Sequence, residues 1–234
     1  MLALSLFAAV PLMAYADFAN IVGSQLSTFN VFQKVNAYAA GQFADVNENI
    51  WYGVNGQGVV ATAYEYGLMK GADASTFNPE GNMTIAEAVT IAARVHSIYN
   101  GGDGEFTQSS LWYQVYVDYA VTNRIISAGT FSNYEKAATR TEMAYIFART
   151  SVPVVLAFNE MNGPENTVNS LPDVSSATPY QGEIIKLYEA GILTGSGDSG
   201  AFHPDSSITR AEAAAIISRV ILPDARVSGR TYGQ

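Results

Sequence analysis

The stretch Ile208-Thr209-Arg210-Ala211-Glu212-Ala213-Ala214 decides how the rest of the chain can be interpreted. Thr209 and Glu212 form a capping box, in which the Thr209 side chain accepts a hydrogen bond from the Glu212 amide and the Glu212 carboxylate reaches back to the Thr209 amide. Arg210 then occupies the first helical position. The free amides and the helix dipole favour an anion there, so helix stability does not explain this arginine.

The same frame recurs twice upstream, as Thr139-Arg140-Thr141-Glu142 and Thr84-Ile85-Ala86-Glu87. Apolar residues follow each box at positions i, i+3, i+4 and i+7, which predicts amphipathic helices of about three to four turns that pack around a shared axis. We expect the Thr and Glu of each box to be structural caps: Thr84, Glu87, Thr139, Glu142, Thr209 and Glu212. We expect an arginine to close each helix: Arg94, Arg149 and Arg219.

The residues before the first and third boxes also correspond. A helix should end at Gly67 in one copy and at Gly191 in the other, with the glycine as a left-handed cap. Phe77-Asn78-Pro79 and Phe202-His203-Pro204 follow in corresponding loops. The glycines are 124 residues apart (191 − 67) and the box threonines 125 (209 − 84), so one extra loop residue accounts for the difference.

The second copy is less regular. It opens near Trp112 and has Arg124 in place of the capping glycine. Asn123 could take the left-handed conformation instead. No proline follows Phe131, so this loop should be built differently.

Composition excludes several classes of function. The 234 residues carry a net charge of −9, which argues against binding nucleic acid or an anionic membrane surface. The chain has no cysteine, which rules out disulfides and cysteine-based zinc sites. After residue 16, no stretch reaches the roughly 20 apolar residues that span a bilayer, so no transmembrane segment is expected.

The N-terminus resembles a secretory signal peptide. Residues 2–12 are almost wholly apolar and Ala14-Tyr15-Ala16 fits a small-x-small cleavage site, although no Lys or Arg precedes the apolar run. We interpret residues 1–16 as the signal peptide; a buried N-terminal helix is the alternative. Residues 17–42 are a lead-in segment that partly fits a helical stripe, residues 153–170 a linker, and residues 224–234 a C-terminal tail.

The Asp-Val and Trp-Tyr openings, the helix ending in Gly-Leu/Ile-x-x-Gly, the Phe-x-Pro loop and the Thr-Arg-Ala-Glu box together resemble the S-layer homology (SLH) domain. The resemblance covers three tandem repeats, at residues 43–99, 106–152 and 171–223. It implies an all-α fold, with three helix-loop-helix repeats arranged in pseudo-threefold fashion around a central helical bundle.

The resemblance also implies a function. SLH repeats leave grooves that bind secondary cell-wall polysaccharide, typically pyruvylated, and so anchor a secreted protein to the wall or S-layer of a Gram-positive-type bacterium. In that family the box arginine engages the acidic group, which implies Arg210 and Arg140 here. Free amides at the helix start would add to an anion site. The implied loop residues are Gly191, Gly195, Gly67 and Gly71.

Ile85 replaces the box arginine in the first copy, so two working grooves are expected. Trp51, Trp112 and Tyr180 could stack on a sugar face, with core packing as the favoured alternative. Arg140 and Arg210 could also be ordinary surface residues.

Catalysis has little support, because the only histidines, His96 and His203, belong to different copies and no acidic pair suits a glycosidase. The glycine-rich residues 100–105 lack the ligand spacing of a calcium loop. We therefore expect no catalytic residues, no cofactor and no metal. A wall-active carbohydrate enzyme, or the anchoring part of one, remains an alternative. So does a structural S-layer subunit that contacts other S-layer proteins.

Overall fold

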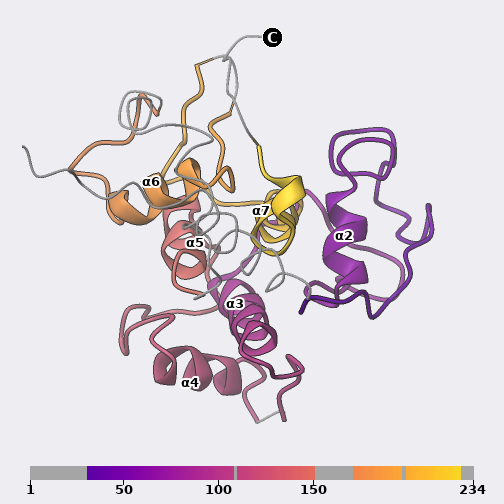
Figure 1. Ribbon diagram of the computed structural model, residues 1–234, viewed down its shortest axis with the longest axis horizontal. Helices are drawn as coiled ribbons and strands as arrows, with labels where there is room; N and C mark the ends of the chain where they lie inside the picture. The colour runs from indigo at the N-terminus through magenta and orange to yellow at the C-terminus, as the bar shows by residue number, and fades with distance from the viewer. Residues whose placement is uncertain (1–30, 108–109, 151–170, 197–198, 228–234) are drawn as a thin grey trace, which may run out of the picture.

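The computed structural model describes residues 31–107, 110–150, 171–196 and 199–227 (Figure 1). The predicted signal peptide, most of the lead-in segment, the linker and most of the tail lie outside these residues. Within them the regular structure is helical, and β-pairing is limited to isolated bridges. The all-α prediction is confirmed.

A helix follows each capping box: α3 (Ile85–Tyr99), α5 (Arg140–Phe147) and α7 (Arg210–Ile221). These three lie in the middle of the molecule in Figure 1. The other three lie towards the outside: α2 (Val59–Glu65), α4 (Gln114–Thr122) and α6 (Gln181–Glu189). A short 3-10 helix, η2 (Pro223–Ala225), follows α7.

All three capping boxes are present in the structure. In the third box, the Glu212 amide donates to Thr209 Oγ1 over 3.2 Å, and the Thr209 amide donates to Glu212 Oε2 over 2.9 Å. The apolar stripe that follows is buried, with Ala213, Ile217 and Val220 fully inaccessible to solvent. The box therefore starts the helix, and burial of its apolar face stabilises it.

Each outer helix packs on the box helix of a different copy. Helix α2 of the first copy contacts α7 of the third, α4 of the second contacts α3 of the first, and α6 of the third contacts α5 of the second. A single copy therefore cannot bury its own apolar faces. The three copies complete one another's core.

A closed ring of backbone hydrogen bonds joins the copies just before the boxes. The Met83 amide donates to the Ile208 carbonyl over 3.0 Å, the Ile208 amide to the Ala138 carbonyl over 3.0 Å, and the Ala138 amide to the Met83 carbonyl over 2.8 Å. All three side chains are fully buried. This cyclic pattern means that each copy contacts both of the others at the centre of the molecule.

The first two amides of each box helix donate to loop carbonyls of another copy. The first copy donates to the second, the second to the third, and the third to the first. The acceptors are Lys136 and Tyr134 for α3, Ser206 and Pro204 for α5, and Gly81 and Pro79 for α7. Helix starts leave such amides unsatisfied within the helix. The expectation that they would be free to bind an anion is wrong for these two positions.

Several local predictions need correction. Only Arg219 lies in the last turn of its helix, because α3 continues past Arg94 to Tyr99 and α5 ends at Phe147, before Arg149. Arg124 is itself left-handed, with φ 60°, whereas Asn123 has φ −92°. The described part of the lead-in, residues 31–42, forms turns and extended chain rather than a helix.

The Phe-x-Pro loops are held by aspartates. Asp45 accepts hydrogen bonds from the Phe77 and Asn78 amides, over 2.8 and 2.6 Å. Asp173 does the same for Phe202 and His203, over 2.7 Å each. Asn78 and His203 are left-handed. In the loop of the second copy the left-handed residue is Gly129 instead, so this loop is built differently, as predicted.

Candidate functional site: two grooves between the copies

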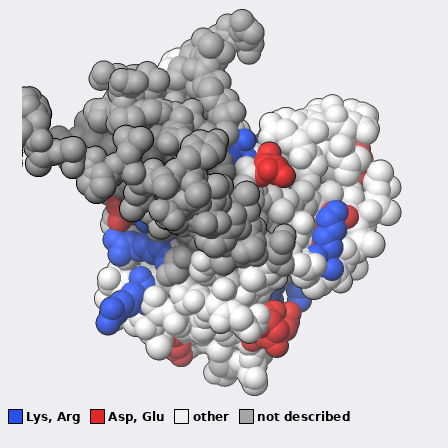
Figure 2. Space-filling view, in the orientation of Figure 1, with Lys and Arg blue, Asp and Glu red and all other residues white. Residues whose placement is uncertain are grey.

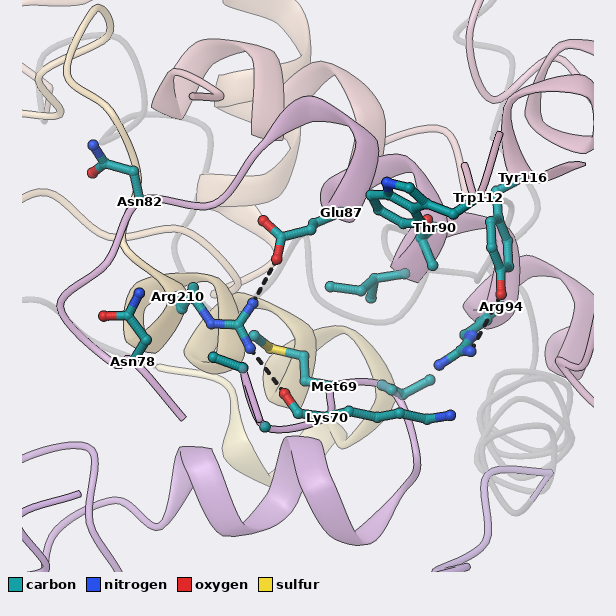
Figure 3. Close-up of a pocket in the computed structure, with 14 residues that line it drawn as sticks. Met69, Lys70, Asn78, Asn82, Glu87, Thr90, Arg94, Trp112, Tyr116 and Arg210 are labelled. Carbon is teal, nitrogen blue, oxygen red and sulfur yellow. Dashed lines mark hydrogen bonds and ion pairs between the residues drawn. The ribbon is translucent and has the colours of Figure 1, made fainter. Parts of the chain in front are cut away.

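Groove 1 is a cavity of about 500 Å³ at the surface of the first copy (Figure 3). Its floor comes from residues 68–72 and from α3, the third copy contributes Arg210, and the second contributes Trp112 and Tyr116. It therefore contains residues from all three copies. The side chains of α3 that line it are Glu87, Thr90, Ile91 and Arg94.

Groove 2 is the corresponding cavity of the third copy, with a volume of about 190 Å³. Residues 193–196 and α7 form its floor, the second copy contributes Arg140, and the first contributes Trp51 and Gln57. The side chains of α7 that line it are Glu212, Ala215, Ile216 and Arg219. These are the positions of Glu87, Thr90, Ile91 and Arg94 shifted by 125 residues.

Arg210 crosses from the third copy to the first. Its side chain is 8% exposed. Nε donates to the Phe77 carbonyl over 2.9 Å, Nη2 donates to the Lys70 carbonyl over 2.8 Å, and Nη1 pairs with Glu87 Oε1 over 2.7 Å (Figure 3). The guanidinium also lies over the Phe77 ring, 5.0 Å from its centroid.

Arg140 makes the same set of contacts from the second copy to the third. Nε donates to the Phe202 carbonyl over 2.6 Å, Nη2 to the Thr194 carbonyl over 2.9 Å, and Nη1 pairs with Glu212 Oε1 over 2.9 Å. Burial lowers the pKa of Arg140, and the neighbouring Glu212 opposes that shift. Breaking a buried pair of this kind is costly, because it leaves an uncompensated charge.

These contacts explain why a cation occupies the first position of α5 and of α7. The alternative that Arg210 is an ordinary surface residue is wrong, because each of its guanidinium nitrogens donates to a protein acceptor. Glu87 serves two partners, with Oε2 on the Thr84 amide and Oε1 on Arg210. Both arginines still line the grooves, so direct contact between either one and a ligand stays a prediction.

The four loop glycines separate into two pairs. Gly71 lines groove 1 and Gly195 lines groove 2. Gly67 and Gly191 lie at helix ends with φ 68° and 70°, outside both groove linings. A Cβ on Gly195 would clash with the Gly200 backbone, so the chain needs glycine there for close approach.

Trp112 and Trp51 lie at the edges of the grooves and are 45% and 41% exposed. Core packing, the favoured alternative for them, is therefore wrong. Their exposed ring surface is available for stacking. Tyr180 lies apart from both grooves and packs on Tyr145.

Several groove 1 residues were not predicted from the sequence, among them Lys70, Thr90, Arg94 and Tyr116. No carboxylate of the described residues pairs with Lys70 or with Arg94, which donates to the Gly67 carbonyl and the Tyr116 hydroxyl over 3.3 Å each. Thr90 Oγ1 and Arg94 Nε are buried without a hydrogen-bond partner in the described structure. Groove 1 therefore presents cations and unused polar atoms to an anionic ligand.

Groove 2 has weaker anion-binding character at the corresponding positions. Thr194 replaces Lys70 and Ala215 replaces Thr90. Arg219 donates to the Ile192 carbonyl over 3.2 Å and to Gln57 Oε1 over 3.4 Å. The recurrence of an arginine seven residues after the Glu of every box was the signal that could have identified Arg94 and Arg219 as groove residues.

On the described part of the face shown in Figure 2, lysines, arginines and acidic side chains are scattered among other residues. No group of three or more His, Asp or Glu side chains that could hold a metal ion occurs in the residues the structure describes. Over those same residues, no helix combines the length and the apolar character that crossing a membrane requires.

Comparison with known proteins found a family model and a relative that are similar to this chain. The family model for the S-layer homology domain matches residues 51–89 and 170–214. The Surface-layer 125 kDa protein of Lysinibacillus sphaericus is 27% identical over 223 residues, which cover 92% of this chain and 17% of that protein. The chain thus spans less than a fifth of the length of this relative. The family model matches the first and third copies, so the resemblance to the S-layer homology domain is confirmed over those residues.

Proposed function

We propose that this chain is a non-catalytic anchoring module that binds an acidic secondary cell-wall polysaccharide through grooves 1 and 2. The carrying observation is that two corresponding grooves each combine a half-exposed tryptophan with an arginine from a box helix. A tryptophan face can pack against a sugar ring, and an arginine can hold a carboxylate such as a pyruvyl ketal.

The charge of the chain sets how such binding must work. A protein of net charge −9 repels an anionic polymer at long range, so affinity has to come from the groove cations themselves. Two grooves that engage one repeating polymer gain from effective concentration. Modest affinity at each groove then suffices for stable attachment.

The test is co-sedimentation of the purified protein with wall sacculi that carry their native polysaccharide. The double variant Trp51→Ala/Trp112→Ala removes both stacking surfaces, and each single variant leaves one groove intact. We expect the double variant to lose most binding and each single variant to lose part of it. Unchanged binding of a folded double variant would contradict the proposal.

Arginine variants suit this test less well, because Arg140→Ala and Arg210→Ala each break a contact between copies as well as a groove wall. Lys70→Thr is cleaner, since it copies the residue of groove 2. Sacculi with and without pyruvyl groups form the second arm. If the ketal is the ligand group, Lys70→Thr should weaken binding only to the pyruvylated form.

The proposal includes the three repeats, at residues 43–99, 106–152 and 171–223, and a location at the wall or S-layer of a Gram-positive-type bacterium. The name of the Lysinibacillus relative favours a second candidate, a structural S-layer subunit. Ordered self-assembly of the purified chain in electron micrographs would support that function. Release of sugar fragments from sacculi would instead support an enzyme.

A further inference from the structure

The second copy should have a groove of its own by the same construction. It would consist of α5, residues 125–128, Ile85 of the first copy and the opening of the third copy. The position that holds Thr90 in groove 1 and Ala215 in groove 2 is Tyr145 here (90 + 55 = 145). A large ring therefore replaces a small side chain on the groove floor.

The Tyr145 ring is packed from two sides. Its centroid lies 4.3 Å from that of Tyr180, which comes from the third copy, and the Arg149 guanidinium lies 4.4 Å from the Tyr145 centroid. The Ser127 amide donates to the Tyr145 hydroxyl over 3.3 Å. Tyr145 is consequently only 4% exposed. The two rings fill the floor of the groove at this position, and the cavity of about 370 Å³ that remains beside Arg149 and Glu183 is not lined by Tyr145.

The arginine of this groove is also paired with a carboxylate. Arg149 corresponds to Arg94, and it pairs with Glu183 of α6 over 2.7 Å. Lys70, the further cation of groove 1, corresponds to Ser127. The anion-binding character of groove 1 is therefore absent from these two positions.

The backbone conformation of Tyr180 is a second indication that its ring packs on Tyr145. Tyr180 caps the start of α6 in the left-handed conformation, with φ 56°, and the corresponding cap of α2 is Gly58, with φ 64°. A residue with a side chain is strained in this conformation. Such strain persists only where packing compensates for it. The contact between Tyr180 and Tyr145 supplies that packing.

The arginine that crosses between copies is missing at this junction. Ile85 occupies its position and is fully buried. Two of the three acceptors that would receive an arginine have partners within the second copy: Glu142 Oε1 pairs with Lys136 over 2.7 Å, and Thr130 Oγ1 donates to the Ser127 carbonyl over 2.9 Å. These two acceptors therefore do not need the arginine.

We infer that Tyr145 and Tyr180 close the groove of the second copy, so that the three repeats provide two ligand-binding grooves and Tyr145 determines this number. The inference rests on the proposed function for the number of sites that a glycan occupies. Closure itself is a property of the protein alone, and it can be measured without a ligand.

The first test of closure is nitration of tyrosines by tetranitromethane in the folded full chain, followed by peptide mass mapping. We expect Tyr145 to remain unmodified in the wild type and to become modified in Tyr180→Ala, which uncovers its ring. Nitration of Tyr145 in the folded wild type would overturn the inference, whatever the protein binds.

The second test counts sites by calorimetric titration with a purified oligosaccharide repeat of pyruvylated wall polysaccharide. The wild type should bind two equivalents and Ile85→Arg/Tyr145→Ala three. The reciprocal variant Thr90→Tyr places the same ring in groove 1 and should bind one, which keeps the test decisive if the opened variant does not fold. Three equivalents for the wild type, or two for a folded opened variant, would overturn the inference. A wild type that binds none refutes the proposed function, and nitration then decides closure.

Discussion

A cation at the first turn of a helix is locally unfavourable, yet Arg210 and Arg140 occupy that position. Each guanidinium nitrogen of these side chains donates to another copy, where two carbonyls and one carboxylate accept the hydrogen bonds. The local cost is small beside the loss of a buried, charge-assisted contact.

Arg210→Lys should therefore destabilise the protein by about 3 kcal/mol, because an ammonium cannot reproduce the planar fork or the stacking on Phe77. Urea denaturation followed by circular dichroism measures the change. Lys34→Ala is the control, since Lys34 forms an exposed pair with Glu65 and its loss should cost less than about 1 kcal/mol. Equal effects for the two variants would show that the Arg210 contacts carry little stability.

Arg124 lies in the left-handed region where the other copies have Gly67 and Gly191. Arg124→Gly should stabilise the protein by about 1 kcal/mol, because glycine adopts this conformation without steric cost. Gly191→Ala is the reverse experiment, since its Cβ would lie 2.6 Å from the Val227 carbonyl oxygen. Chemical denaturation should move the two midpoints in opposite directions, and a lower midpoint for Arg124→Gly would contradict the prediction.

At the scale of elements, each Phe-x-Pro loop depends on one aspartate to receive two consecutive amides. Burial alone would raise the pKa of Asp173, but hydrogen bonds from the Phe202 and His203 amides outweigh it and lower the pKa below its usual value. The loop supplies the carbonyl that holds Arg140. Asp173 therefore supports the junction between the second and third copies.

The sign of the pH dependence follows from that shift. A carboxylate with a lowered folded pKa stabilises the protein above its unfolded pKa of about 3.9, and this contribution is lost as the pH falls through the folded value. Asp173→Asn should lower the urea midpoint at pH 6 and flatten its decline towards pH 3. Asp205→Asn, at an exposed position, is the control and should keep the wild-type profile. A wild-type profile in Asp173→Asn would contradict the assignment.

At the scale of the whole molecule, the cyclic hydrogen bonds and the exchanged outer helices make the copies interdependent. We expect a single cooperative thermal transition, with equal calorimetric and van't Hoff enthalpies. Arg210→Lys should move that one transition to lower temperature, even though it alters only the junction of the third and first copies. A separate transition for one copy would show that the copies fold independently.

Much of the fold could be predicted from the sequence, because its signals are local. The capping boxes, the left-handed glycines and the apolar stripes lie within a few residues of one another, so their chemistry acts before any distant contact forms. The arginine and the glycine of each groove were predicted only through the resemblance to the family, and core packing was favoured for the tryptophans. The partners of those residues were not.

The sequence by itself determined three box helices, their start points and the exception at Ile85. Only the tertiary structure decided that the arginines bind neighbouring copies, that the tryptophans are half-exposed and that Tyr145 meets Tyr180. Arg210 donates to the carbonyl of a residue 140 positions away, and no local pattern encodes such a partner. Local hydrogen bonds and hydrophobic periodicity set the helices, whereas the burial of each charge and ring depends on which copies come together.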